Sequence, residues 1–252
     1  MRTIAFLNIK GGVGKSTTSF NVAVGLADKG KRVLLVDFDP QCNTTSIFCE
    51  SDPRDTIDNL IKQEITDVKE VIISVEENLS FIPSSLLLAN TEVSLRTTGV
   101  GLLHNKLVKI LSKIENEYDY CIIDCAPIIN LLTINAIIAS DEIIVPIKPD
   151  RFALAGFNLT IQNILMIRDN YEIDIDYKVL FTIVNRNNVE KDIIEAVRNS
   201  VGNRAFKTQI RNQPKPIAEA STNTQFVIRS DSSVASDFKE LVEEILNNNG
   251  EC

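Results

Sequence analysis

Short apolar runs alternate with amphipathic segments along most of the chain. The runs have the length of buried parallel strands and cover residues 3–8, 31–37, 79–83, 118–124, 142–146 and 178–184. Helical patterns separate or follow them at 16–29, 55–62, 102–114 and 234–246, and a longer one ends near Asn170. This alternation predicts an α/β fold, with a mostly parallel twisted sheet covered by helices on both faces.

Length and composition fit one soluble domain. The chain has 252 residues, of which 44% are apolar and 24% charged, and its length alone would allow one large α/β domain or two small ones. We expect residues 1–252 to form a single α/β domain. No apolar run approaches the roughly 18–20 residues of a membrane span. The N-terminus leads directly into the first strand without a signal peptide, and we expect a cytoplasmic protein.

The cysteines and the histidine do not indicate a disulfide framework or a metal site. Five cysteines form no C-x-x-C pair, and their odd number argues against a set of disulfides. Cys121 and Cys125 lie in and just after an apolar run and are interpreted as core thiols. The single histidine, His104, is expected on a helix surface.

A glycine-rich loop joins the first predicted strand to the first predicted helix. It reads Lys10-Gly11-Gly12-Val13-Gly14-Lys15-Ser16-Thr17 and fits the phosphate-loop pattern G-x-x-x-x-G-K-[ST], except that Ile9 replaces the leading glycine. Small residues let backbone N–H groups surround a polyphosphate, and the helix start adds positive potential. Lys15 would reach the β- and γ-phosphates and Ser16 would bind Mg²⁺. The alternative is a glycine-rich turn without a ligand.

Carboxylates follow two other predicted strands. Asp37 and Asp39 end the run at 31–37 and begin the turn after it, and Asp124 ends the run at 118–124. Parallel strands present their carboxyl ends at the edge where α/β sheets bind ligands. Asp124 fits the carboxylate that holds the Mg²⁺ shell in phosphate-loop enzymes. The alternative for Asp39 is an N-cap for a helix that begins near Asn43.

Several motifs together resemble the ParA/MinD family of ATPases, which carry a deviant Walker A loop with a second lysine. The loop K-G-G-V-G-K-S-T resembles that form, as do D-x-D-P-Q at residues 37–41, L-T-x-N-A at 132–136 and F-x-L-x-G at 152–156. The resemblance is tight over 3–48 and 118–158 and looser over 178–220. Glu92 is in register with a further family motif.

The resemblance implies Mg²⁺-dependent ATP hydrolysis and a role for each matched residue. Lys10 would reach across a homodimer interface to the partner's nucleotide; a solvated surface lysine is the alternative. Asp39 would prepare the attacking water, with Asp37 assisting, and Ser16, Asp39 and Asp124 would make up the Mg²⁺ site. Asn185, unless it is an ordinary turn residue, would recognise adenine.

The last strand of the family matches residues 206–212. The resemblance therefore implies that Ile210 and Arg211 border the base. Residues 213–220 depart from the family pattern through two prolines and an added residue, which leaves nucleotide contacts there open.

Charge is distributed unevenly along this acidic chain. The formal net charge is −8, but residues 178–229 carry +5 and the remainder −13. A local basic patch can bind phosphates because its field is set by charges within a Debye length of ~8–10 Å. The candidate DNA contacts are Lys207, Arg211, Lys215 and Arg229; the alternative is that they are scattered solvated side chains.

Within this family, the sequence favours a ParA/Soj-type DNA-partitioning ATPase. Such a protein would bind DNA non-specifically as an ATP dimer, associate with the nucleoid and respond to a ParB-type partner. The chain begins at the first strand, without a helix-turn-helix extension, so specific operator binding is not expected. Positioning of a cargo other than DNA remains an alternative.

The sequence disfavours two other functions that occur in this family, membrane association and electron transfer. A MinD-type membrane helix would be rich in Lys and Arg, whereas residues 231–252 hold one lysine and six acidic residues. The cysteine contexts also differ from those of the electron-transferring nitrogenase iron protein, another relative.

Overall fold

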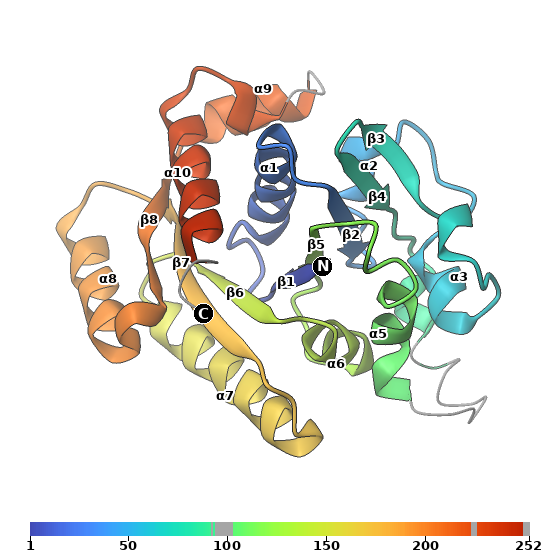
Figure 1. The fold of residues 1–252 in the computed structure, drawn as a ribbon. Coiled ribbons are helices and arrows are strands. Elements are labelled where there is room, and N and C mark those ends of the chain that lie inside the picture. The colour runs from blue at the N-terminus through green and yellow to red at the C-terminus, as the bar shows by residue number, and fades with distance from the viewer. Residues whose placement is uncertain (92, 94–102, 223–225, 249–252) are drawn as a thin grey trace.

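The fold is built on one eight-stranded sheet with the strand order β3-β4-β2-β5-β1-β6-β7-β8 (Figure 1). The computed structural model of the chain describes residues 1–91, 93, 103–219 and 226–248, together with the backbone of 220–222. The strands are β1 (Arg2–Phe6), β2 (Val33–Phe38), β3 (Ile73–Glu76), β4 (Leu79–Ile82), β5 (Tyr120–Cys125), β6 (Glu142–Ile147), β7 (Asp176–Val184) and β8 (Ala205–Arg211). All neighbours pair in parallel except β3, which runs antiparallel to β4.

Helices cover both faces of this sheet, as the sequence pattern predicts (Figure 1). One face carries α1 (Lys15–Asp28) and α10 (Ser233–Asn247), with α9 (Pro214–Thr222) nearby. The other face carries α3 (Ile57–Lys62), α5 (Lys106–Leu111), α6 (Leu131–Ile138), α7 (Ala153–Tyr171) and α8 (Asn188–Val201). The short α2 (Thr45–Phe48) follows β2, and 3₁₀ turns occupy Val68–Glu70, Leu103–Asn105, Gly202–Arg204 and Val227–Arg229.

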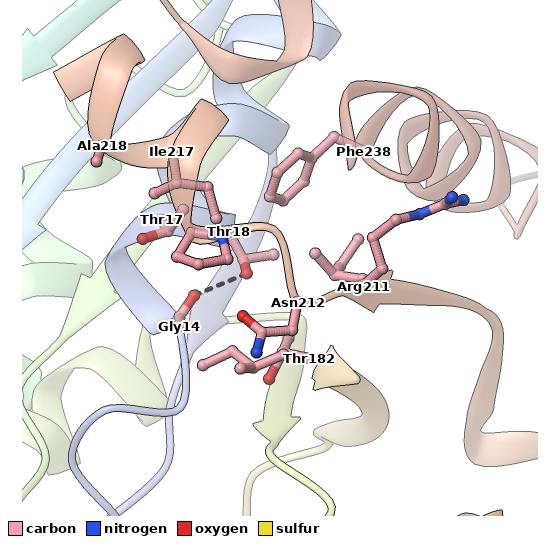
Figure 2. A pocket seen from close by; sticks show the side chains of 12 residues that line it. Gly14, Thr17, Thr18, Thr182, Arg211, Asn212, Ile217, Ala218 and Phe238 are labelled. Atoms are coloured by element: carbon pink, nitrogen blue, oxygen red, sulfur yellow. Dashed lines mark hydrogen bonds between the residues drawn. The ribbon is translucent and has the colours of Figure 1, made fainter. Parts of the chain in front are cut away.

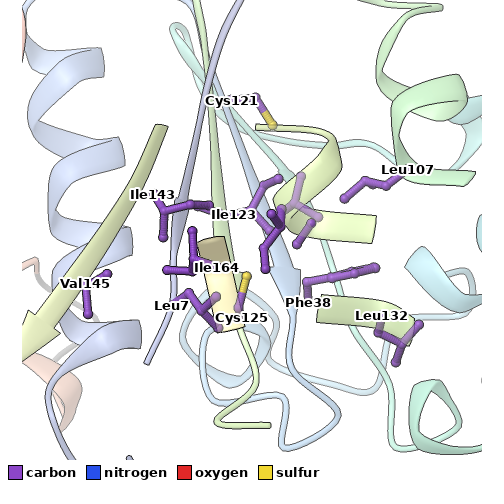
Figure 3. Packing of buried hydrophobic residues seen from close by; sticks show 14 of the residues in the cluster. Leu7, Phe38, Leu107, Cys121, Ile123, Cys125, Leu132, Ile143, Val145 and Ile164 are labelled. Carbon is purple, nitrogen blue, oxygen red and sulfur yellow. The ribbon is translucent and has the colours of Figure 1, made fainter. Parts of the chain in front are cut away.

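The two cores follow from the alternation of side chains along each strand. In β1, Ile4 and Phe6 face the core under α1 and α10, whereas Ala5 faces the opposite core. Figure 3 shows this second core, where Ile123 and Ile143 from the sheet meet residues of the covering helices. Strands buried on both faces explain why the sequence shows continuous apolar runs in place of alternating ones.

The predicted strands and most helices are confirmed, with differences in the weaker regions. The helical pattern at 102–114 forms a 3₁₀ turn followed by α5, and the segment at 50–78 contains α3, a 3₁₀ turn and β3. Helices α6, α8 and α9 have no counterpart among the expected helices. Cys121 and Cys125 are buried free thiols, as expected, and the His104 ring contacts the Tyr171 ring in a tilted arrangement. Glu92 lies outside the described residues.

The final helix is part of the core. The apolar face of α10, which includes Phe238, Leu241 and Val242, packs over the sheet beside α1. Close contact requires Gly25 on α1, because a Cβ there would lie 2.5 Å from Ile228 Cδ1 and 2.6 Å from Val242 Cγ2. None of the described helices is both long and apolar enough to cross a bilayer.

Truncation of Leu241 tests how far α10 supports the fold. Leu241→Ala removes a fully buried side chain and should lower the free energy of unfolding by about 2–5 kcal/mol. The matched control Leu159→Ala, at a half-exposed position on α7, should change it by no more than about 0.5 kcal/mol. Urea unfolding without nucleotide measures both; equal effects would contradict this role for α10.

Candidate functional site

The glycine-rich loop after β1 curls back on itself before α1 begins. Gly12 and Gly14 have φ values of 70° and 79°, a conformation that favours glycine. The Gly14 carbonyl accepts hydrogen bonds from the Thr18 backbone N–H at 2.9 Å and from the Thr18 hydroxyl at 2.7 Å. The Thr182 hydroxyl of β7 donates to the Val13 carbonyl at 2.7 Å. The loop is thus fixed from both sides, as a preorganised anion site requires.

Asn8 anchors the start of the loop, a role that the sequence analysis did not identify. Its Nδ2 donates to the Pro146 carbonyl at the end of β6 at 2.7 Å. Its Oδ1 accepts from the Lys10 backbone N–H at 2.9 Å and from the Thr160 hydroxyl at 3.2 Å. A polar residue directly after a buried strand was the available signal, but two of its partners, Pro146 and Thr160, lie 138 and 152 positions away.

Two neighbouring cavities are lined in part by the glycine-rich loop. The more polar of the two contains most of the loop residues predicted to bind phosphate. This loop cavity, of about 320 Å³, is lined by Gly11, Gly12, Gly14, Lys15, Ser16, Thr17, Phe20, Asp39, Gln41, Asn43, Ile47 and Pro127. Lys15 is only 7% exposed. Burial lowers the pKa of Lys15, while the charges of Asp124 and Asp39 act in the opposite direction.

Two of the three predicted carboxylates, Asp39 and Asp124, lie close to Lys15. The sheet register places Asp37 of β2 directly opposite Asp124 of β5. Asp124 Oδ2 accepts from the Thr44 hydroxyl at 2.7 Å, whereas its buried Oδ1 has no hydrogen-bond partner in the described part of the chain. Burial raises the pKa of Asp124, although the nearby hydroxyls of Ser16 and Thr44 act in the opposite direction.

Asp37, and not Asp39, holds the start of α2. Asp37 Oδ2 accepts from both the backbone N–H and the hydroxyl of Thr45 at 2.7 Å. Among the described residues, Asp39 Oδ1 accepts a hydrogen bond only from the Gln41 backbone N–H, at 2.9 Å, in a local turn. The alternative interpretation of Asp39 as a helix cap is therefore wrong, and its carboxylate faces the loop cavity.

This group of side chains fits a hard divalent cation. Asp39 and Asp124 lie close to the buried Lys15, and a fully buried carboxylate oxygen of Asp124 has no hydrogen-bond donor in the described part of the chain. Mg²⁺ prefers carboxylate, hydroxyl and water oxygens and is commonly completed by substrate phosphates. Ser16 and Asp124, with Asp39 close by, are the residues that would hold it.

Lys10 does not point into the loop cavity of its own chain. Its Nζ forms a salt bridge with both oxygens of Asp150, at 2.7 and 2.6 Å, just before α7. Gly156 on α7 lies next to the Lys10 side chain, and a Cβ there would be in ordinary van der Waals contact with it at 3.8 Å. Burial opposes ionisation of Asp150, but the hydrogen bond from Lys10 holds the pKa of that carboxyl below its ordinary value.

A second, largely apolar cavity of about 290 Å³ adjoins the loop cavity and shares Gly14 and Thr17 with it (Figure 2). It lies between β7, β8, α9 and α10 and is lined by Gly14, Thr17, Thr18, Thr182, Ile183, Ile210, Arg211, Asn212, Pro214, Ile217, Ala218 and Phe238. The residues after Asn212, where the sequence departs from the family pattern, thus form one wall of this cavity through α9. A polar end beside an apolar end suits a nucleotide.

Of the residues predicted to contact or border the base, Ile210 and Arg211 line the apolar cavity and Asn185 does not. Ile210 lines the apolar cavity, whereas the Arg211 side chain points away from Gly14 (Figure 2), and its Nε donates to Asp237 Oδ2 at 2.7 Å. Asn185 does not line the cavity; its Nδ2 donates to Glu190 at 2.8 Å. Asn212 and Thr182, which do line it, were not singled out from the sequence.

The four candidate DNA contacts differ in their surroundings. Arg211 pairs with Asp237, and Arg229 pairs with both Asp28 and Glu76 at 2.6 Å. These arginines connect separate elements of the fold. Lys207 and Lys215 are both exposed. The Lys215 Nζ lies 3.8 Å from Oε1 of Glu219, one helical turn away. The two lysines are the better-placed pair for a phosphate backbone.

Fold and loop together define a phosphate-loop protein, and comparisons with known proteins narrow this class. The profile of a family described as an AAA domain matches residues 1–179. The sporulation initiation inhibitor protein Soj of Bacillus subtilis is 33% identical over 253 residues, covering 98% of this chain and 99% of that protein. The chromosome-partitioning ATPase Soj of Treponema pallidum is 31% identical, covering 99% of both chains. The chain belongs to the ParA/Soj family of P-loop ATPases.

Solved structures show the same fold. A putative plasmid partition protein from Borrelia burgdorferi, solved with AMPPNP, has a TM-score of 0.84 at 25% identity and is covered over 99% of its length by 98% of this chain. Cobyrinic acid a,c-diamide synthase from Mycobacterium smegmatis, solved with ADP and magnesium, has a TM-score of 0.85 at 23% identity, covering 100% of this chain and 96% of that one.

The buried carboxylates predict an unusual pH dependence of stability. Burial and the charge of Asp124 raise the pKa of Asp37, so the folded protein binds more protons than the unfolded chain above about pH 4. The nucleotide-free protein should therefore lose stability as pH rises from about 4 toward neutral. Asp37→Asn should flatten this slope, and the exposed control Asp174→Asn should leave it unchanged. Urea unfolding at several pH values measures it; an unaltered slope in Asp37→Asn would contradict the assignment.

Proposed function

We propose that the protein binds ATP with Mg²⁺ and hydrolyses it slowly, as a switch between a monomer and an ATP-bound dimer. The loop amides and Lys15 would hold the β- and γ-phosphates, and the apolar cavity would take the base. Ser16 and Asp124 would hold Mg²⁺, whose charge helps neutralise the transferred phosphoryl group. The main support is that Lys15 and Asp39 line one glycine-lined cavity and that Asp124 lies close to Lys15.

Hydrolysis would depend mostly on positioning. Asp39 lines the loop cavity with its side chain held by the turn at Gln41, so it can orient a water toward the γ-phosphate. Lys15, which is buried beside the loop, and the loop N–H groups would stabilise the negative charge that develops in the transition state. Asp37 supports this arrangement by fixing Thr45 and the Asp39 backbone.

Lys10 would couple nucleotide state to dimerisation. In the single chain its ammonium group is paired with Asp150. Family resemblance assigns it a phosphate of the partner subunit's nucleotide, so its ion pair with Asp150 would be exchanged for that contact on dimerisation. A ligand shifts an equilibrium only through different contacts in the two states, and this exchange supplies one.

The proposed output is non-specific DNA binding by the ATP dimer, with a ParB-type partner that stimulates turnover. Family membership and the names of the Soj relatives support a role in DNA partitioning. Lys207 and Lys215 supply exposed positive charge on an otherwise acidic chain. Such contacts act by releasing counterions from the DNA backbone and do not require base recognition.

Two substitutions separate nucleotide binding from hydrolysis. Lys15→Ala should weaken ATP binding about a hundredfold, because the phosphates lose a charge-assisted partner. Asp39→Ala should retain ATP and lower the turnover rate by about a hundredfold or more. Isothermal titration and phosphate release with Mg²⁺ measure the two effects. Wild-type turnover in Asp39→Ala would remove this residue from the mechanism.

Substitutions of Lys10 and of Asp150 should have opposite effects on ATP-dependent dimerisation. Lys10→Ala should bind ATP but fail to dimerise. Asp150→Asn should release Lys10 and strengthen ATP-dependent dimerisation by up to about fivefold, the upper range for an ion pair that solvent still reaches. Analytical ultracentrifugation with a non-hydrolysable ATP analogue measures both. ATP-driven dimers of Lys10→Ala would show that this lysine does not act across the interface.

Retention on DNA distinguishes the proposed DNA binding from the alternative, the positioning of another cargo. Replacing Lys207 and Lys215 together by Ala should weaken ATP-dependent retention on non-specific duplex DNA and reduce the slope of log affinity against log salt by about 1–2. The control replaces Lys109 and Lys113, exposed lysines near α5, and should not change the slope. A wild-type protein that is not retained on DNA with ATP would favour the positioning of another cargo.

A further inference from the structure

We propose that a cavity between α3 and α5 binds one phosphoryl group, carried either by inorganic phosphate or by a small phosphorylated molecule. This lysine cavity, of about 170 Å³, is lined by Leu60, Gln63, Ile65, Thr66, Val68, Lys106, Lys109, Ile110 and Lys113. The two helices lie against each other on one face of the sheet (Figure 1). The lysine cavity shares no described lining residue with the loop cavity or the apolar cavity, so the proposal is independent of the proposed ATPase function.

The charge of the lysine cavity has one sign. Three of its lining residues are lysines, and no acidic residue in the described part of the chain lines it. Apolar side chains form much of the remaining wall, and those of Leu60, Val68 and Ile110 are buried. Charges of one sign beside low-dielectric walls concentrate their field in the space between them. The cavity is therefore a place of positive potential that attracts an anion.

Lys106 is the strongest single indication of a ligand. The residue is only 8% exposed, yet within the described residues its ammonium group has no hydrogen-bond or ion-pair partner. Its backbone N–H, in contrast, donates to Asn135 Oδ1 at 2.7 Å. Lysine side chains are rarely buried to this extent unless they are paired. An anion in the lysine cavity would supply the partner.

The spacing of the three lysines brings them to one side of the same helix. Lys106 and Lys109 belong to α5 and Lys113 follows its end, so the residues are three and four positions apart. Residues at these spacings are neighbours on a helix surface, and like charges there repel each other. The arrangement opposes folding when the cavity is empty, and a bound anion would offset that repulsion.

The end of α3 forms the opposite wall. Gln63 has a φ of 65°, and the backbone N–H of Glu64 returns to the Asn59 carbonyl at 2.9 Å, which turns the chain toward Thr66. Lys113 Nζ donates to the Thr66 carbonyl at 2.7 Å, so the two walls are joined at the cavity. The Gln63 amide and the Thr66 hydroxyl can serve as additional neutral donors to an anion.

Acidic residues close in sequence to these walls have other partners. Glu64 Oε2 accepts from Asn59 Nδ2 at 2.9 Å. Asp67 Oδ1 accepts from the Lys69 backbone N–H at 3.0 Å, and Glu117 forms an ion pair with the Lys69 ammonium group at 2.7 Å. The carboxylates of this region are thus engaged outside the lysine cavity, and its positive charge is left for a ligand.

The size and charge of the cavity favour a phosphoryl group. Its volume is below the roughly 300–1,000 Å³ of ordinary small-molecule pockets, so it suits one compact group. A phosphoryl group carries close to two negative charges and three strong acceptor oxygens, which matches three lysines better than a single carboxylate does. The cavity is too small for a stretch of duplex backbone, so it does not add to the DNA contacts proposed for Lys207 and Lys215.

The test exchanges chloride for inorganic phosphate at constant ionic strength, without nucleotide, and measures the free energy of unfolding in urea. A ligand that binds only the folded chain raises this free energy according to its concentration and its dissociation constant. The glycine-rich loop is itself a proposed phosphate site, so Lys15→Ala serves as the background in which its contribution is weakened. The stabilisation by phosphate should persist in Lys15→Ala.

Three substitutions on this background locate the site. Lys106→Met keeps the apolar stem but removes the ammonium group, and should raise the phosphate dissociation constant about tenfold or more. Lys109→Gln alters an exposed position that does not endanger the fold, and should raise it about threefold. The control Lys239→Gln removes the same charge from an exposed position on α10 and should leave it unchanged. Comparison with this control also cancels the general stabilising effect of phosphate salts.

Further ligands distinguish the source of the phosphoryl group. Tighter binding of glycerol 3-phosphate than of inorganic phosphate would support a phosphorylated molecule, and the reverse order would support free phosphate. Equal stabilisation by acetate would show a carboxylate site and overturn the proposed chemistry. Loss of the phosphate effect in Lys15→Ala itself, or the same dissociation constant in Lys106→Met and Lys109→Gln as in Lys239→Gln, would overturn the site. Because no nucleotide is present, none of these outcomes decides whether the protein binds or hydrolyses ATP.

Discussion

The central constraint on this molecule is the concentration of negative charge where β2, β5 and β1 end together. Parallel register places Asp37 opposite Asp124, and both are completely buried. The Thr44 and Thr45 hydroxyls and the buried Lys15 offset part of this charge. The carboxylates thereby oppose folding and at the same time create a site for a cation and a polyphosphate. Stability and ligand binding are therefore linked in this region.

The loop over these carboxylates is rigid because remote elements hold it. Asn8 ties its start to β6 and α7, and Thr182 ties its middle to β7. These bonds satisfy buried backbone groups that would otherwise be costly. They also connect the phosphate end of the site to the strands that carry the apolar cavity. A nucleotide that fills both cavities would contact a single hydrogen-bonded framework.

Charge on the surface is distributed differently from what the linear count indicates. The basic excess of residues 178–229 includes arginines that form ion pairs with acidic residues distant in sequence, such as Arg229 with Asp28 and Glu76. The net charge of residues 178–229 includes these arginines but leaves out acidic partners such as Asp28 and Glu76, which lie outside this segment. The free positive surface is therefore smaller than the segment charge, and it is concentrated on lysines such as Lys207.

The sequence by itself determined the α/β class, the strand–loop–helix unit and the three carboxylates, because these depend on local patterns: apolar runs, glycine spacing and acidic residues at strand ends. Only the tertiary structure decided which groups meet across the chain. It placed Lys10 on Asp150, Asp37 at the start of α2, and Asn212 against Asn185. Hydrogen bonds and ion pairs act over a few ångströms, so partners that are tens to hundreds of residues apart are selected by strand order and register, which no local pattern encodes.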